Sequence, residues 1–135
     1  MALHAEAGSR SDQVAEEAAM EAVCGACHTL ELVTTRIRSK QAWFGIFEQM
    51  LNLGAQGTDK QFAAVGRYIL TRLTQVRVNE APADELALLL DIPGSVAAAI
   101  VSYRERQKIV DLEDLRSVPG IDADELASWA DRIVF

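Results

Sequence analysis

Two cysteines and a histidine stand together in the run Cys24-Gly25-Ala26-Cys27-His28, and the 135-residue chain has no further cysteine. Two thiols at this spacing can exchange disulfides, bind zinc or form thioether bonds to haem. The histidine directly after the second cysteine favours haem, because its imidazole can then ligate the iron. Zinc would need about four ligands, and the other histidine of the chain is His4, in a tail that we expect to be disordered. The motif therefore predicts one covalently bound haem c, with thiol redox chemistry as the alternative.

The iron of such a haem needs a sixth ligand, and the three methionines are the candidates. A thioether in this position raises the reduction potential into the range that electron carriers use. Met1 lies in the tail, and Met20 lies on the helix that leads into the cysteines, too close to them to reach the opposite face of the haem. Met50 follows His28 by 22 residues and lies on the apolar face of a predicted helix. A methionine on such a face is ordinarily core filler, but here we predict that Met50 is the second axial ligand.

A first predicted helix leads into the cysteine motif, after a lead-in at residues 1–11 that is small and polar. It runs from about Gln13 to Val23, and Ser11 or Asp12 can cap it. Its predicted apolar stripe consists of Val14, Ala18 and Ala22. Residues 29–40, which follow the motif, are expected to be irregular and are basic.

Two further helices are predicted to complete this part of the chain. The second spans residues 41–53, and Gly54 ends it. Its apolar side chains recur at helical spacing, at Trp43, Ile46, Phe47, Met50 and Leu51. The third begins at a cap formed by Thr58 or Asp59 and continues to about Thr74. Its inward residues are expected to be Phe62, Val65, Ile69 and Leu73.

Four short helices are predicted after a junction at residues 75–79, at residues 82–90, 94–106, 112–118 and 122–131. Tight turns at Ile92-Pro93-Gly94 and Val118-Pro119-Gly120 join them in pairs, as a weak internal duplication. The sequence therefore predicts an all-α chain, with the disordered lead-in at residues 1–11, a first domain at residues 12–76 and a second at residues 77–135.

Residues 20–74 resemble a family of small bacterial monohaem cytochrome c domains. The family pattern is CxxCH, a basic stretch, a tryptophan with a methionine seven residues later, Gly-Ala and a capped helix. In this chain the pattern is Cys24 to His28, Arg36 to Lys40, Trp43 with Met50, Gly54-Ala55, and Thr58 to Leu73. The resemblance implies Met50 as the distal haem ligand. It also implies that Trp43 packs on the haem and Arg38 contacts a propionate, while a core tryptophan and a solvated arginine are the alternatives.

Residues 78–135 resemble the tandem helix-hairpin-helix domain of bacterial competence DNA receptors. The resemblance is carried by residues 78–86, 99–105, 112–115, 118–121 and 131–135. DNA-binding members have a Gly-hydrophobic-Gly hairpin whose backbone amides approach phosphates closely. Here the hairpins are Asp91-Ile92-Pro93 and Gly120-Ile121-Asp122, and the second is followed by Asp124 and Glu125. Because carboxylates stand where a phosphate would dock, we expect the fold of this family without its DNA binding.

The net charge of −7 falls entirely in the C-terminal part of the chain. Residues 1–79 hold eight acidic and eight basic residues, whereas residues 80–135 hold twelve acidic and five basic ones. An acidic domain repels phosphate backbones and favours basic protein partners. No apolar stretch of about 18 residues is present, so the sequence predicts no membrane span.

The two resemblances together imply an electron-transfer protein and not an enzyme. Its partners would be redox proteins, such as a dehydrogenase, an oxidase or a larger complex, and the helix-hairpin-helix domain would dock a partner or mediate self-association. Haem is attached to this motif outside the bacterial cytoplasm, which implies a periplasmic or extracytoplasmic location and a signal peptide already removed from this chain. The alternative is a haem-containing DNA-binding protein of the competence-receptor type.

Overall fold

The computed structural model describes residues 10–135 and confirms an all-α protein with two very short strands. The described chain divides into two compact units, which meet between Thr74 and Gln75. Arg10 and Ser11, which the sequence assigns to a disordered lead-in, already belong to the first helix. The rest of that predicted segment, residues 1–9, lies outside the described residues.

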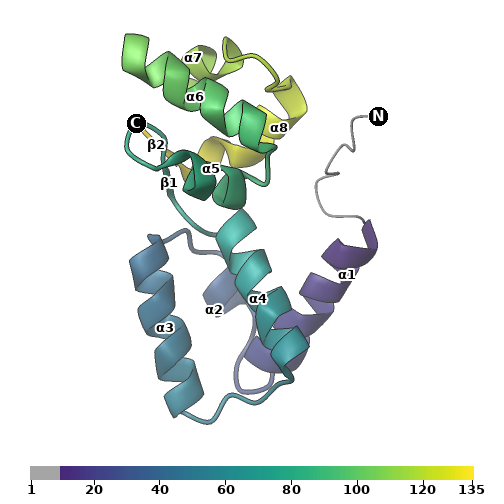
Figure 1. The fold of residues 1–135 in the computed structure, drawn as a ribbon. Coiled ribbons are helices and arrows are strands. Elements are labelled where there is room, and N and C mark those ends of the chain that lie inside the picture. Colours follow the sequence, from purple (N-terminus) through teal and green to yellow (C-terminus); the bar gives the residue numbers. More distant parts are fainter. Residues whose placement is uncertain (1–9) are drawn as a thin grey trace. The chain divides into compact units, whose positions relative to one another are not determined.

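The N-terminal unit consists of α1 (Arg10–Ala19), α2 (Glu31–Thr34), α3 (Lys40–Asn52) and α4 (Asp59–Arg72), as Figure 1 shows. A π-helical turn, η1 (Met20–Cys24), continues α1 to the first cysteine. The helices α3 and α4 lie side by side and run in opposite directions (Figure 1). Both have the caps that their sequences favour, since Ser39 accepts a hydrogen bond from the amide of Ala42, and Thr58 and Gln61 form a reciprocal capping box.

The buried face of α1 differs from the predicted one. Val14 is 61% exposed, and Ala18 and Ala22 are exposed as well. The helix instead buries Glu16, Ala19, Met20 and Val23. Glu16 can be buried because its carboxylate lies 3.1 Å from Nε of Arg67 and 3.6 Å from Nη2 of Arg72, both on α4. The predicted apolar stripe was therefore wrong, because the face that α1 buries includes a charged residue and is not marked by apolar side chains alone.

The core of this unit joins η1, α2, α3 and α4. Its buried apolar side chains include Met20, Val23, Cys24, Val33, Trp43, Val65, Ile69 and Leu73. The inward residues predicted for α4 are therefore confirmed, with Phe62 half-buried. On α3 the prediction holds for Trp43, whereas Met50 is half-buried and Leu51 is exposed.

The C-terminal unit contains α5 (Ala83–Leu90), α6 (Gly94–Arg106), α7 (Leu112–Arg116) and α8 (Ala123–Trp129), close to the four predicted helices. A 3₁₀ turn, η2 (Ala130–Arg132), follows α8. Two short strands that the sequence does not predict, β1 (Val76–Arg77) and β2 (Ile133–Val134), pair in parallel and bring the two ends of the unit together. Buried Arg132 links η2 to α5, since its guanidinium donates a hydrogen bond to the carbonyl oxygen of Leu89 at 2.9 Å.

The two hairpins of this unit share one backbone geometry. Asp91 has a φ of 53° and Gly120 has a φ of 92°, so both occupy the left-handed region at equivalent points of their turns. Gly120 also lies against the first turn of α6, because a Cβ at this position would be 2.8 Å from Cγ2 of Val96. Glycine is therefore required at the second hairpin by conformation and by space.

Within residues 10–135, none of the helices has both the length and the apolar character needed to cross a bilayer.

Candidate functional site

The cysteine motif lies at the end of η1, where the π-helical turn passes into a loop. Cys24 is buried, with 6% of its surface exposed, whereas Cys27 is exposed and His28 is half-buried. This turn requires glycine at position 25, between the cysteines, since a Cβ on Gly25 would lie 2.5 Å from the carbonyl oxygen of Glu21. The turn thus presents one thiol to the core and the other to solvent.

The environment of the thiols disfavours disulfide exchange. Burial raises the pKa of the Cys24 thiol above its ordinary value, so this cysteine is less available as a thiolate. Reactive cysteines of thiol oxidoreductases have the opposite property, a lowered pKa. Both cysteines are free thiols. Among the described residues, no group of three or more His, Cys, Asp and Glu side chains is gathered as a metal site would require.

The imidazole of His28 is oriented by its neighbour. Its Nδ1 lies 3.0 Å from the carbonyl oxygen of Thr29. In the tautomer that carries its proton on Nδ1, this nitrogen donates to that oxygen and Nε2 keeps a free lone pair. Metal-ligating histidines commonly have this arrangement.

Met50 and Cys24 line the same two small cavities, each of about 10 Å³. The helix α3 places Met50 there, 26 residues after Cys24, in contact with the core around η1. His28 lines neither of these two cavities. The structure therefore brings together the first cysteine and the predicted thioether ligand, and it leaves the predicted imidazole ligand outside their shared space.

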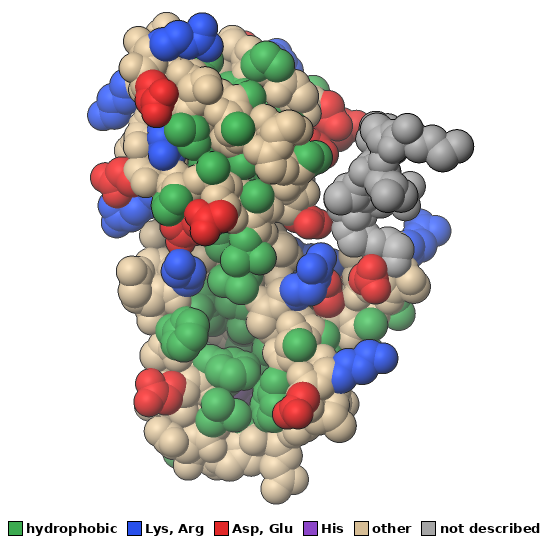
Figure 2. All heavy atoms as spheres, in the orientation of Figure 1, with side chains coloured by type: hydrophobic (Ala, Val, Ile, Leu, Met, Phe, Trp, Pro, Cys, Tyr) green, Lys and Arg blue, Asp and Glu red, His purple; other side chains and the backbone are tan. Residues whose placement is uncertain are grey.

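A larger pocket, of about 360 Å³, opens between α3 and α4. Figure 2 shows hydrophobic side chains gathered over these two helices. The lining comes from both helices: Lys40, Trp43, Phe44, Phe47, Phe62, Ala63, Gly66, Ile69 and Leu70. Its size falls in the range of ligand pockets, about 300–1,000 Å³. The two cavities beside Cys24 are far smaller than a porphyrin, but this adjoining pocket has room for a large part of one.

Trp43 lines this pocket near the start of α3, and Arg38 contacts Trp43 without lining the pocket itself. The indole Nε1 of Trp43 donates to the carbonyl oxygen of Leu73 at 2.7 Å. The guanidinium of Arg38 lies over the indole ring, 5.6 Å from its centroid. Its Nε is buried, and within the described part of the chain no atom accepts a hydrogen bond from it. A buried donor of this kind is costly unless an anion pairs with it.

These observations fit a haem in the chemistry of the donor set: two free thiols, an oriented imidazole, a thioether beside Cys24 and an unsatisfied guanidinium nitrogen. Two lining residues of the larger pocket, Ala63 and Gly66, and the buried acid Glu16 were missed by sequence reasoning. Small residues one turn apart on the same helix were the available signal for the first two. No signal marks Glu16, because its partners lie 51 and 56 residues later.

The second candidate site is the pair of hairpins in the C-terminal unit, as a nucleic-acid interface. The carboxylate of Asp122 caps α8 and accepts from the amide of Glu125 at 2.8 Å. The pKa of Glu125 is raised by partial burial first, and then by the charges of Asp122 and Asp91. The acidic groups of the two hairpins are therefore close enough to repel each other, and an incoming phosphate would be repelled as well.

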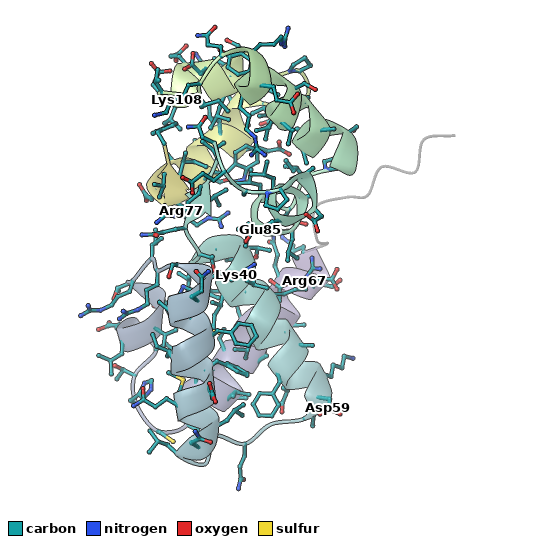
Figure 3. All side chains as sticks on the ribbon, turned by 60° about the vertical axis from the view of Figure 1, so that its left-hand side comes forward. Lys40, Asp59, Arg67, Arg77, Glu85 and Lys108 are labelled. Atoms are coloured by element: carbon teal, nitrogen blue, oxygen red, sulfur yellow. The ribbon has the colours of Figure 1, made fainter. Side chains whose placement is uncertain are left out.

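Three of the basic residues of this unit, Arg104, Arg106 and Lys108, lie at or after the end of α6 that is far from the first hairpin. The helix α6 begins at the first hairpin, is 13 residues long and ends at Arg106. The end of α6 is about 20 Å from its start. Lys108, which is labelled in Figure 3, follows that end of the helix. Pro93 removes a further amide from the first hairpin. Neither hairpin offers the glycine-rich, cation-flanked amides that phosphate binding uses.

Comparison with protein families assigns the C-terminal unit. Residues 72–134 match the model of the family described as helix-hairpin-helix motif, so this stretch of the chain carries that motif. The match begins after the cysteine motif, and the resemblance of residues 20–74 to cytochrome c domains stays a prediction. No curated protein matches the chain. No solved structure matches it either.

Proposed function

We propose that the N-terminal unit holds one covalently attached haem c and carries single electrons between redox proteins in the periplasm or another extracytoplasmic space. The observation that carries this proposal is the meeting of Cys24 and Met50 at the same two cavities. Met50 follows the CxxCH run by 22 residues, and the two line the same cavities only because side chains of α3 pack against η1. The proposal is therefore supported by sequence and tertiary packing together.

In this proposal each residue of the site has one role. The thiols of Cys24 and Cys27 add across two vinyl groups; each S–H bond breaks, an S–C bond forms, and the proton goes to the other vinyl carbon. Nothing is released, and no oxidant is needed. His28 and Met50 ligate the iron, Trp43 packs on the ring, and Arg38 pairs with a propionate. When bound, the haem supplies an iron that accepts one electron from a reduced protein and passes it to an oxidised one.

Two protein ligands leave the iron without an open position for substrate, so the proposed role is electron transfer without catalysis. The C-terminal unit would then be a docking or assembly module for a redox partner. Its acidic hairpins favour a partner with a basic contact surface.

Covalent haem is the test of the first proposal. The chain is produced in the periplasm of a bacterium with a haem c maturation system, and the purified protein is extracted with acidified acetone. A Soret band that stays with the protein is expected for the native chain, and none for the Cys24→Ala/Cys27→Ala variant. Met50→Ala should keep the attached haem and lose the long-wavelength sulfur-to-iron band of the oxidised form. A native protein without attached haem would refute the proposal.

A haem-containing DNA-binding protein is the second candidate, because residues 72–134 carry a motif that often binds DNA. The acidic hairpins argue against it. The deciding experiment is a titration of double-stranded DNA with the full chain at several salt concentrations. Weak binding with no dependence on the hairpins is expected. Micromolar affinity with a steep salt slope would favour the DNA-binding function.

A further inference from the structure

We infer that the plate of the proposed haem enters the pocket between α3 and α4, and that Phe47 is the partition that must move to admit it. The inference rests on the proposed function, which names the haem and its ligands but not the space that receives it. The two cavities beside Cys24 and Met50 hold about 10 Å³ each, so the plate has to find room elsewhere. The adjoining pocket of about 360 Å³ is open to solvent and supplies that room.

Phe47 is the residue that lines all three spaces. Its ring meets Phe62 edge to face, with 5.9 Å between centroids and 86° between planes. The ring is half-buried at the side of an open pocket, and this aromatic contact helps to hold it in place. Rotation of one side chain would therefore join the space beside Cys24 to the space between α3 and α4.

The α4 wall of the pocket suits a flat ring. Ala63 and Gly66 lie on this wall about one turn apart. A Cβ on Gly66 would meet no heavy atom of the described residues within 4 Å, so the wall is level and open there. On the opposite wall, α3 contributes Trp43 and Phe44. Two apolar walls, one flat and one aromatic, favour stacking of a planar conjugated ligand.

The end of the pocket at the start of α3 suits carboxylates. Lys40 lines the pocket in the first turn of α3. Two residues before it, Arg38 has a buried Nε from which no described atom accepts a hydrogen bond. An anion would satisfy this buried donor. Figure 3 shows Lys40 and Asp59 at opposite ends of the α3–α4 pair, so the pocket has one cationic end. A planar apolar ligand with carboxylates at one edge, which haem is, matches this polarity.

A pair of glycines gives a matched test. Gly66→Leu puts a branched side chain on the floor of the pocket, whereas Gly45→Leu makes the same change on the exposed side of α3, where a Cβ likewise meets nothing within 4 Å of the described atoms. Both variants and the native chain are produced with the haem c maturation system, and covalent haem per polypeptide is measured. Gly66→Leu should lower it about tenfold, the size of effect that overpacking gives. Gly45→Leu should leave it unchanged.

Phe47→Ala tests the partition and should attach haem at least as well as the native chain. Circular dichroism of each variant shows whether it has folded. Equal haem content in folded Gly66→Leu and native protein would overturn the inference while the proposed function stands. Loss of haem from folded Phe47→Ala would overturn it too. Absence of covalent haem from the native chain would instead refute the proposed function.

A second experiment tests whether the pocket binds haem without covalent attachment. Free haemin is titrated into the cysteine-less Cys24→Ala/Cys27→Ala protein and into the same protein with Gly66→Leu. Saturable binding that the added leucine weakens by about tenfold is expected. Equal binding by the two proteins would mean that the pocket does not receive the plate. Quenching of tryptophan fluorescence reports on Trp43 in this titration, and Trp129 of the other unit provides the background.

Discussion

The carbonyl oxygen of Leu73 accepts a hydrogen bond of 2.7 Å from the indole Nε1 of Trp43, 30 residues earlier in the chain. The same oxygen accepts from the backbone amide of Arg38 at 3.0 Å. The end of α4 is thereby held against the start of α3. Trp43 therefore has a structural role in the protein without any cofactor.

Trp43→Phe is expected to lower the free energy of unfolding by about 1–2 kcal/mol, for one lost hydrogen bond and a small cavity. The loss stays moderate because the Leu73 oxygen keeps its bond from Arg38. Urea unfolding followed by circular dichroism measures it. Leu53→Ala, at a side chain that is 81% exposed, is the control and should change stability by less than about 0.5 kcal/mol. A Trp43→Phe protein as stable as the native one would show that the indole hydrogen bond contributes nothing.

Gly120→Ala is expected to destabilise the helix-hairpin-helix unit by about 1–3 kcal/mol. The added methyl group would combine a φ of 92° with a contact of 2.8 Å to Val96. Thermal unfolding of the full chain gives the measurement. Gly94→Ala is the control, because a Cβ there meets no described atom within 4 Å. Combining Gly120→Ala with Val96→Ala removes the clash but not the backbone strain. Gly120→Ala should therefore cost less stability in the Val96→Ala background than in the native chain. An equal cost in the two backgrounds would show that the contact with Val96 is not a cause of the destabilisation.

Glu125→Gln should stabilise the protein slightly at neutral pH. The folded state raises the pKa of Glu125, so its ionisation opposes folding, and this cost is present above the raised pKa and absent below the ordinary value of about 4.5. The side chain is mostly solvated, which limits the gain to about 0.5 kcal/mol. Urea midpoints at pH 7 and pH 4, in low salt, measure the difference between native and variant proteins. A gain that is the same at both pH values would contradict the electrostatic explanation.

The two thiols should react at different rates in protein purified without haem. Cys27 is exposed, whereas Cys24 is buried and has a raised pKa, so iodoacetamide at pH 7 should label Cys27 first. Mass spectrometry of the peptides locates the label. Labelling of Cys24 should increase at higher pH and become equal to that of Cys27 in urea. Faster reaction at Cys24 in the folded protein would favour the thiol-redox alternative.

Local patterns predicted most of the helices well. The turn residues Pro93 and Gly120 and the cap Thr58 act within a few residues of themselves, and their signals are contained in the sequence. The face of α1 was predicted wrongly because burial of Glu16 depends on arginines more than 50 residues away. The pairing of β1 with β2 was missed for the same reason, since each strand is two residues long and has its partner at the other end of the unit.

The sequence by itself determined the chemistry that the chain can offer: two thiols and an imidazole in five residues, one methionine at a useful distance, and hairpins with carboxylates in place of glycines. These are properties of residue type and local spacing, which folding does not alter. Only the tertiary structure decided that Met50 lies beside the same cavities as Cys24, that Arg38 buries an unsatisfied nitrogen over Trp43, and that Phe47 lines both those cavities and the pocket between α3 and α4. Those relationships depend on how helices pack side chain against side chain over long separations in the chain, which periodicity does not specify.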